Sequence, residues 1–117
     1  MKNFKELKVW QKGVEIAVNS YKLVDTFPAT EKYSLSQQIT RAAVSIPSNI
    51  AEGSSRSSEK DYARFLEISL GSSFELETQY LIAQKVNFGD QQLVINGLQM
   101  LNEEQRMIMA FLNKLYK

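Results

Sequence analysis

Apolar residues recur along this chain at steps of three and four, which is the spacing of one face of an α-helix. The pattern predicts four helices, over residues 6–25, 35–53, 59–86 and from 91 onward. No stretch alternates apolar and polar positions as a half-buried strand would, and the connections are a few residues long. The 117 residues therefore predict an all-α fold of one domain, an antiparallel, up-down-up-down four-helix bundle.

The second predicted helix carries three local signals. Ser34 followed by Gln37 has the spacing of a capping box, which would start the helix. Pro47 lies inside the helix and is predicted to kink or loosen it, because proline lacks a backbone donor and disfavours the helical conformation of the preceding residue. Gly53 is predicted to end the helix in a left-handed conformation, ahead of the serine-rich turn over residues 54–58.

The third predicted helix has comparable signals at its ends. Ser58, three residues before Asp61, is predicted to cap its start. Gly89 is predicted to end the third helix, and Asp90 is predicted to cap the last helix. The middle of the third helix is rich in small residues, namely Ser69, Gly71, Ser72 and Ser73. Since glycine in a helix costs about 1 kcal/mol relative to alanine, we expect another backbone, from a neighbouring helix or another subunit, to approach closely there.

The aromatic residues fall into two groups by their place on the predicted helix faces. One group lies on core stripes: Trp10, Tyr21, Tyr62 and Tyr80. The other group lies partly off these stripes: Phe74, Phe88 and Tyr116. Because large apolar side chains outside a core mark interaction surfaces, the second group predicts a buried subunit contact.

Charge and composition exclude several classes of protein. Fourteen Lys and Arg against thirteen Asp and Glu leave a net charge of +1, unlike the strongly basic balance of an autonomous nucleic-acid-binding domain. The chain has no histidine and no cysteine, so it cannot form the usual zinc sites or a Ser-His or Cys-His nucleophile pair. We expect no enzymatic activity and no cofactor. A cytoplasmic location is expected, with no export signal and no membrane span in the sequence.

Carboxylates alone could still hold a magnesium or manganese ion, drawing on Glu52, Glu67, Glu75 and Glu77. The spacing disfavours such a site, because Glu75 and Glu77 lie about 200° apart around a helix and cannot face one ion together. We therefore expect no metal, and expect these side chains to serve as surface charges or ion-pair partners.

The segment from Arg41 to Arg64 carries the candidate site. Polar side chains follow the second helix and reach the third, and they predict either a polar stripe or a subunit contact: Ser45, Ser48, Asn49, Glu52 and Glu67. Four cationic side chains lie along the same segment: Arg41, Arg56, Lys60 and Arg64.

Two interpretations of these cationic side chains remain open. In the first, they pair with carboxylates or contact another subunit, as Arg64 can with Glu67 along one helix. In the second, Arg56, Lys60 and Arg64, with Arg41 farther away, present positive charge to phosphates beside the free amides at the start of the third helix.

Four motifs, in order along the chain, resemble one known family. They are FKELKVWQ at Phe4–Gln11, SIPSNIAEG at Ser45–Gly53, RSSEKDYARFL at Arg56–Leu66 and GSSFELETQ at Gly71–Gln79. Together they closely resemble the bacterial 23S rRNA-intervening-sequence proteins, over nearly the whole chain.

The resemblance implies a four-helix bundle that assembles as a homopentamer. The family's name records that some members are encoded within 23S rRNA genes. The family is also distantly similar to the accessory variability determinant of diversity-generating retroelements, a pentameric barrel described as binding nucleic acid and a reverse transcriptase. Five copies of this chain would carry only about +5, so attraction to phosphate would depend on where the charges lie.

The sequence thus leads to one hypothesis and one alternative. The hypothesis is a non-enzymatic homo-oligomer whose Arg41-to-Arg64 surface binds structured RNA or another nucleic acid. The alternative is a protein-protein interaction scaffold without a nucleic-acid ligand, in which the same stripe is the subunit contact and an exposed apolar patch recruits a partner. Phosphate contacts weaken steeply with salt and apolar contacts do not, which separates the two.

Overall fold

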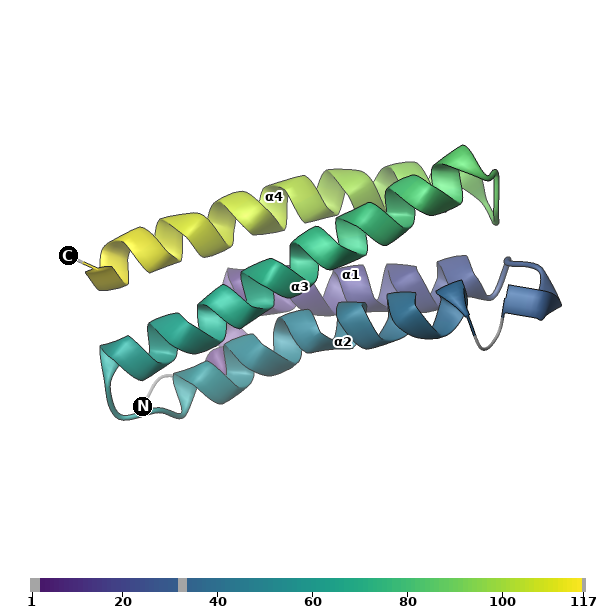
Figure 1. Cartoon of the computed structure of the whole chain (residues 1–117). Helices are drawn as coiled ribbons and strands as arrows, with labels where there is room; N and C mark the ends of the chain where they lie inside the picture. The colour runs from purple at the N-terminus through teal and green to yellow at the C-terminus, as the bar shows by residue number, and fades with distance from the viewer. Residues whose placement is uncertain (1–2, 32–33, 117) are drawn as a thin grey trace.

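The structure is a computed structural model that describes residues 3–31 and 34–116. These residues form four α-helices and two short 3-10 helices, and no strand: η1 (Phe4–Glu6), α1 (Lys8–Val24), η2 (Ala29–Glu31), α2 (Leu35–Ser54), α3 (Glu59–Lys85) and α4 (Gln91–Tyr116). The four long helices lie side by side in an elongated molecule of 44 × 22 × 20 Å (Figure 1), consistent with a four-helix bundle. In the part of the chain described, no helix is both long and apolar enough to cross a membrane.

The helices form a closed square in cross-section. α1 lies against α2, α2 against α3, α3 against α4, and α4 against α1 (Figure 1). Among the described residues, neither α1 and α3 nor α2 and α4 approach each other closely along their backbones. The side formed by α1 and α2 is therefore opposite the side formed by α3 and α4.

The core is built from the predicted apolar faces of all four helices. Its largest fully buried side chains include Ile16, Leu23, Ile39, Ile46, Ile50, Leu66, Leu76, Tyr80, Leu101 and Ile108. The prediction for Tyr21 is wrong: this side chain is 55% exposed, because it lies on the edge of α1 beside α2. Trp10 and Tyr62 are half-buried against the core.

The aromatic residues predicted to lie off the core have different environments. Phe88 packs on Phe27, with ring centroids 5.9 Å apart, so a contact within the chain explains it. Phe74 and Tyr116 are exposed, as expected for side chains outside the core.

Helix ends at α3 and α4 follow the local signals. The Ser58 side chain accepts a hydrogen bond of 3.1 Å from the Asp61 amide and caps α3, as predicted. Gly89 has the left-handed φ of +77°, and Asp90 accepts a hydrogen bond of 2.9 Å from the amide two residues on, as predicted. Asn87 also has a left-handed φ, of +58°, and this conformation was not predicted from the sequence. The tight connection between α3 and α4 thus takes two left-handed residues.

Two predicted helix starts are wrong. The first helix was predicted from residue 6, but α1 begins at Lys8, because Phe4–Glu6 form η1 and Leu7 is extended with φ −74° and ψ 125°. The Ser34 side chain makes no capping hydrogen bond, so the capping box predicted with Gln37 does not form.

The predicted end of the second helix is also wrong. Gly53 lies inside α2, which continues through Pro47 and ends at Ser54. A Cβ atom at Gly53 would lie 2.9 Å from the Cβ of Phe65, which is closer than real contacts allow. Glycine occupies this position because α3 packs directly against it, and not because the helix needs a left-handed end.

Candidate binding surface

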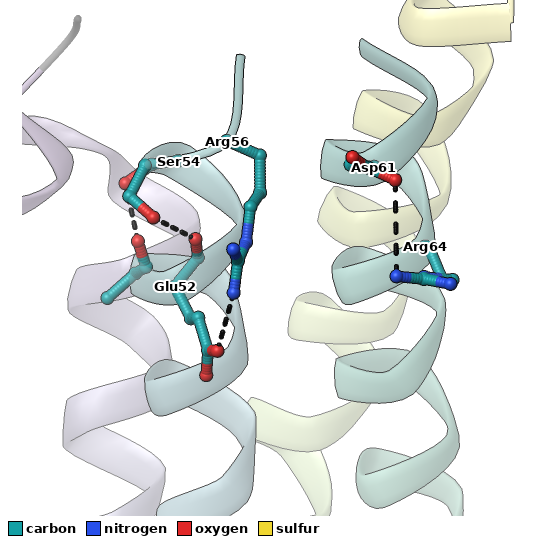
Figure 2. A network of polar contacts seen from close by, with 7 residues as sticks. Glu52, Ser54, Arg56, Asp61 and Arg64 are labelled. Atoms are coloured by element: carbon teal, nitrogen blue, oxygen red, sulfur yellow. Dashed lines mark hydrogen bonds and ion pairs between the residues drawn. The ribbon is translucent and has the colours of Figure 1, made fainter. Parts of the chain in front are cut away.

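Arg56 is held by a carboxylate and an aromatic ring at the turn between α2 and α3. Its Nη2 donates to Oε2 of Glu52 at 2.8 Å (Figure 2), and its guanidinium lies 4.7 Å from the centre of the Phe65 ring. Glu52 occupies the last turn of α2, so the pair closes over the end of that helix. The charge of Arg56 is therefore already balanced within the chain.

Arg64 pairs with Asp61 on the first turns of α3, at 4.0 Å (Figure 2). The predicted pairing of Arg64 with Glu67 is wrong. Glu67 instead accepts a hydrogen bond from the hydroxyl of Tyr116 at the end of α4, and this bond raises the pKa of that hydroxyl. Lys60 is exposed on the same turn of α3.

The local charge at this end of the molecule is not positive. Residues 52–67 contain three cationic side chains, Arg56, Lys60 and Arg64, and four carboxylates, Glu52, Glu59, Asp61 and Glu67. A surface that attracts phosphate over a distance needs a clear excess of positive charge. The α2–α3 turn does not have this excess.

Arg41 lies away from the other three cationic side chains. It lines a cleft between α2 and α3 together with Gln38, Ser45, Ser72 and Glu75. Its position is fifteen residues before Arg56, which corresponds to about 20 Å along the helix axis. The structure thus brings Arg56, Lys60 and Arg64 to one end of the molecule and leaves Arg41 in the α2–α3 cleft.

One member of the predicted polar stripe, Ser45, joins α2 to α3 within one chain. The hydroxyls of Ser45 and Ser72 share a hydrogen bond of 2.8 Å, and Asn49 donates to both the carbonyl and the hydroxyl of Ser45. Ser69 donates to the carbonyl of Ile46 at 2.9 Å. The close approach expected at the small residues of α3 is therefore made by α2.

Ser48 of the polar stripe and Gly71 of the small-residue part of α3 face outward. Ser48 is exposed on α2. A Cβ atom at Gly71 would have no neighbour within 4 Å, so no contact within the chain explains this glycine.

The carboxylates considered for a metal have separate partners. Glu52 binds Arg56, Glu67 binds Tyr116, Glu75 accepts from Gln79, and Glu77 accepts from Gln105. Over residues 3–31 and 34–116, no three acidic side chains lie close enough together to hold one metal ion.

Apolar side chains form a groove on the side of the molecule made by α1 and α2. The α1/α2 groove is lined by Val14, Ala17, Val18, Tyr21, Lys22, Val44 and Pro47. Three of these, Val18, Tyr21 and Val44, are large and exposed. This groove was not predicted, because Tyr21 was assigned to a core stripe and neither Val18 nor Val44 was assigned to a surface.

Apolar side chains also gather on the opposite side. We define the α3/α4 face by Phe74, Leu81, Ile95, Leu98 and Met109. Phe74 and Leu81 flank Glu77 by three and four positions, and Glu77 binds Gln105 of α4, so both lie on the side of α3 that meets α4. Ile95 and Leu98 line a cleft whose other side chains are polar, and Met109 is four positions beyond Gln105. The polar side chains of this cleft are Gln84 of α3 and Gln99, Asn102, Glu103 and Arg106 of α4.

The core also holds two buried polar groups: the hydroxyl of Tyr80, a residue predicted to lie on a core stripe, and the carboxyl of Glu104, which was not predicted to be buried. The Tyr80 hydroxyl accepts from the Asn19 side chain at 2.9 Å and shares a hydrogen bond of 2.8 Å with Ser20. The Glu104 carboxyl is fully buried, and neither of its oxygens has a hydrogen-bond partner. The signal for Glu104 was its spacing, three residues after Leu101 and four before Ile108, on the core face of α4.

Burial raises the pKa of Glu104 from 4.5 to about 8. The positive charge of Lys12 lowers this pKa, and the negative charge of Glu15 raises it, both to a smaller extent than burial. At neutral pH the folded chain therefore holds this carboxyl mostly in its protonated form.

Comparison with known proteins supports the motifs. A protein of unknown function from the S23 ribosomal protein family of Bacteroides thetaiotaomicron has a similar crystal structure, with a TM-score of 0.79. The match covers 89% of this chain and 97% of that one at 22% sequence identity, so it shows a shared fold. No curated protein matches the chain. The family described as 23S rRNA-intervening sequence protein matches residues 5–110, and the chain belongs to this family.

Proposed function

We propose that this chain is a non-enzymatic, cytoplasmic protein that assembles with copies of itself through two different surfaces of an antiparallel bundle. The observation that carries the proposal is the pair of apolar surfaces on opposite sides. In the α1/α2 groove, Val44 is 41% exposed; on the α3/α4 face, Phe74 is 48% exposed and Ile95 44%. Large apolar side chains gathered on a surface mark protein contacts.

The contacts between α2 and α3 support the up-down-up-down order. Ser45 meets Ser72, whereas Gly53, later in α2, meets Tyr62, earlier in α3. Residue numbers therefore rise along one helix as they fall along the next.

The two surfaces favour contact between unlike sides of neighbouring copies. The α1/α2 groove is concave and is lined mainly by Val, Ala and Pro side chains, with Tyr21 and Lys22 beside them, whereas the α3/α4 face presents Phe74 and Met109. A contact between unlike surfaces repeats from copy to copy and closes into a ring when the rotation permits. A pentameric ring is the assembly that the family resemblance implies, and in such a ring each copy contributes one groove and one face.

Light scattering on two single variants tests this assembly. Val44→Asp places a charge in the α1/α2 groove, and Phe74→Asp places one on the α3/α4 face. Both positions are exposed in the single chain, so the core should remain intact. Each variant alone is expected to be monomeric. An equimolar mixture is expected to form dimers, because each variant keeps one intact surface that fits the partner's intact surface.

The outcomes that contradict the assembly are specific. If Val44→Asp keeps the wild-type mass, the groove is not a subunit contact. If one variant forms dimers by itself, the contact joins like surfaces, and if the mixture stays monomeric, the groove does not bind the face. Ser48→Asp is the matched control, exposed on α2 but not among the residues that line the groove, and it should assemble normally. Loss of assembly in this control would move the contact to the polar stripe.

A second candidate function is binding of structured RNA at the turn between α2 and α3. The observation that favours it is Arg64, whose side chain is 71% exposed and whose ion pair with Asp61 is long, at 4.0 Å. In a ring this turn would recur once per copy, so weak contacts would add. Arg56 and Lys60 lie nearby, but the carboxylates of the same segment limit the expected affinity.

Gel shift with total bacterial RNA at low and high salt tests this second function. RNA binding predicts a shift at low salt that is lost at high salt and weakened by Arg56→Ala with Arg64→Ala. Arg106→Ala, an exposed arginine on α4, is the control. A wild-type protein that shifts no RNA at low salt would leave the assembly as a protein-interaction scaffold without a nucleic-acid ligand.

A further inference from the structure

The carboxyl of Glu104 lies where α1, α2 and α4 meet. A Cβ atom at Gly13 of α1 would lie 3.0 Å from Oε2 of Glu104 and 3.2 Å from the Cβ of Pro47 in α2. The carboxyl therefore occupies the small space that glycine leaves between the three helices. Pro47 also lines the α1/α2 groove, so this junction lies directly beneath that surface.

The surroundings of the carboxyl offer it little compensation. Neither oxygen has a hydrogen-bond partner, and α2 presents the apolar side chains of Ile46 and Pro47 to the same space. The charged groups that act on it are Lys12 and Glu15 of α1. Lys12 is already shared between Glu15 at 3.5 Å and Glu103 at 3.8 Å.

We propose that Glu104 is a proton-sensitive switch in the packing of α1, α2 and α4. In its neutral form the carboxyl lets the three helices close around it. In its ionised form it has a buried charge without a partner, which is far more costly than a buried neutral group, so water must enter or the helices must separate. Loosening of this junction would also change the α1/α2 groove through Pro47.

The direction of the effect follows from proton binding. The pKa of Glu104 is about 8 in the folded chain and 4.5 as an ordinary carboxyl, so between these values the folded chain holds a proton that the unfolded chain has released. Stability is therefore highest below about pH 4.5 with respect to this group, falls as pH rises, and levels off above about pH 8. A one-proton difference raises the unfolding constant roughly tenfold per pH unit within this window.

The composition of the chain removes the side chains that ordinarily titrate within or near this pH range. The sequence has no histidine and no cysteine, whose ordinary pKa values lie closest to neutrality. A proton-linked change in stability between about pH 5.5 and 7.5 can therefore be assigned to a side chain with a shifted pKa, and Glu104 is that side chain.

Urea unfolding across this pH range tests the switch, with the fluorescence of Trp10, the single tryptophan, as the readout on α1. Wild type and the control Glu59→Gln, an exposed carboxylate at the start of α3, should show unfolding constants that rise roughly tenfold per pH unit. Glu104→Gln should show a nearly constant value. Equal slopes in wild type and Glu104→Gln would overturn the proposal.

Two further measurements keep the test decisive. If Glu104→Gln does not fold, carbon NMR of the glutamate carboxyls in wild type replaces it: one carboxyl still protonated above pH 6 supports the switch, and full ionisation by pH 6 overturns it. The slope must also be independent of protein concentration, because stability gained by assembly changes with concentration. The switch concerns the single chain and stands whether or not the proposed assembly forms.

Discussion

The hydroxyl of Tyr80 and the carboxyl of Glu104 are both fully buried in the same core, but only one of them is satisfied. The Tyr80 hydroxyl meets Asn19 at 2.9 Å and Ser20 at 2.8 Å, and Asn19 also donates to the Leu93 carbonyl. Glu104 has no partner for either oxygen. One end of the core thus holds a complete hydrogen-bond network, and another part holds an isolated acid.

This difference shows that burial can hold one group in a single protonation state and bring the protonation change of another close to physiological pH. Burial raises the pKa of Tyr80, and the hydrogen bonds from Ser20 and Asn19 lower it again in part. A tyrosine with a raised pKa simply stays neutral, its ordinary form at pH 7. A glutamate with a raised pKa is moved from its ordinary ionised form to a neutral one, and its charge then changes near physiological pH.

The largest expected effect on stability comes from disrupting the hydrogen-bond network of Tyr80 by a substitution at Gly97. A Cβ atom at Gly97 would lie 2.0 Å from Cε2 of Tyr80 and 2.9 Å from Nδ2 of Asn19. Gly97→Ala therefore forces the ring out of its network, with an expected loss of about 3 kcal/mol or more. Urea unfolding at pH 6 measures it, and a wild-type midpoint would show that the ring has room to move.

The next largest effect on stability is expected from replacing the buried acid Glu104. Glu104→Met replaces a buried acid without partners by an apolar side chain of similar length, and we expect a gain of about 2 kcal/mol at pH 7. Because wild type loses stability as pH rises towards 8, the gain should grow from pH 6 to pH 8. Parallel denaturation at the two pH values checks this; a gain that does not change with pH would assign it to packing alone.

Periodicity predicted most of this fold and could have revealed both buried groups. Tyr80 was placed on the core seam of α3 from its spacing, and it is there. Glu104 has the same kind of spacing between Leu101 and Ile108, but no place was predicted for it, because a charged residue type is ordinarily exposed. The pattern gives the face of a helix, and whether a polar group on that face finds a partner depends on the other helices.

The candidate surface could be predicted less well, because its residues contact residues that are distant in the sequence. Glu67 is near enough in sequence to pair with Arg64, yet it binds Tyr116, forty-nine residues away at the end of α4. Gly53 has the sequence context of a helix end, but packing of Phe65 from α3 is what requires it. Local sequence contains neither contact.

A smaller loss is expected when the Tyr80 network loses only its central oxygen. In Tyr80→Phe the ring still fills the core, while Asn19 keeps its bond to the Leu93 carbonyl and Ser20 keeps its bond to the Ile16 carbonyl. The expected cost is therefore about 1 kcal/mol, that of a neutral hydrogen bond rather than of an orphaned group. Thermal unfolding at pH 6 measures it, and a loss as large as that of Gly97→Ala would mean that the hydroxyl organises the whole junction of α1, α3 and α4.

The smallest effect is expected at Gly71, where the same substitution as at Gly97 meets open space. A Cβ atom there has no neighbour within 4 Å, so Gly71→Ala should gain up to about 1 kcal/mol from helix propensity alone. Urea unfolding of the monomeric Val44→Asp background isolates this gain from assembly. In the assembling chain the sign can reverse, because a neighbouring copy packed closely on α3 would meet the new methyl group. Higher stability of the monomer together with a lower mass of the assembling chain in light scattering would therefore place a subunit contact at Gly71. Higher stability of both the monomer and the assembling chain would instead show that this part of α3 is exposed to solvent.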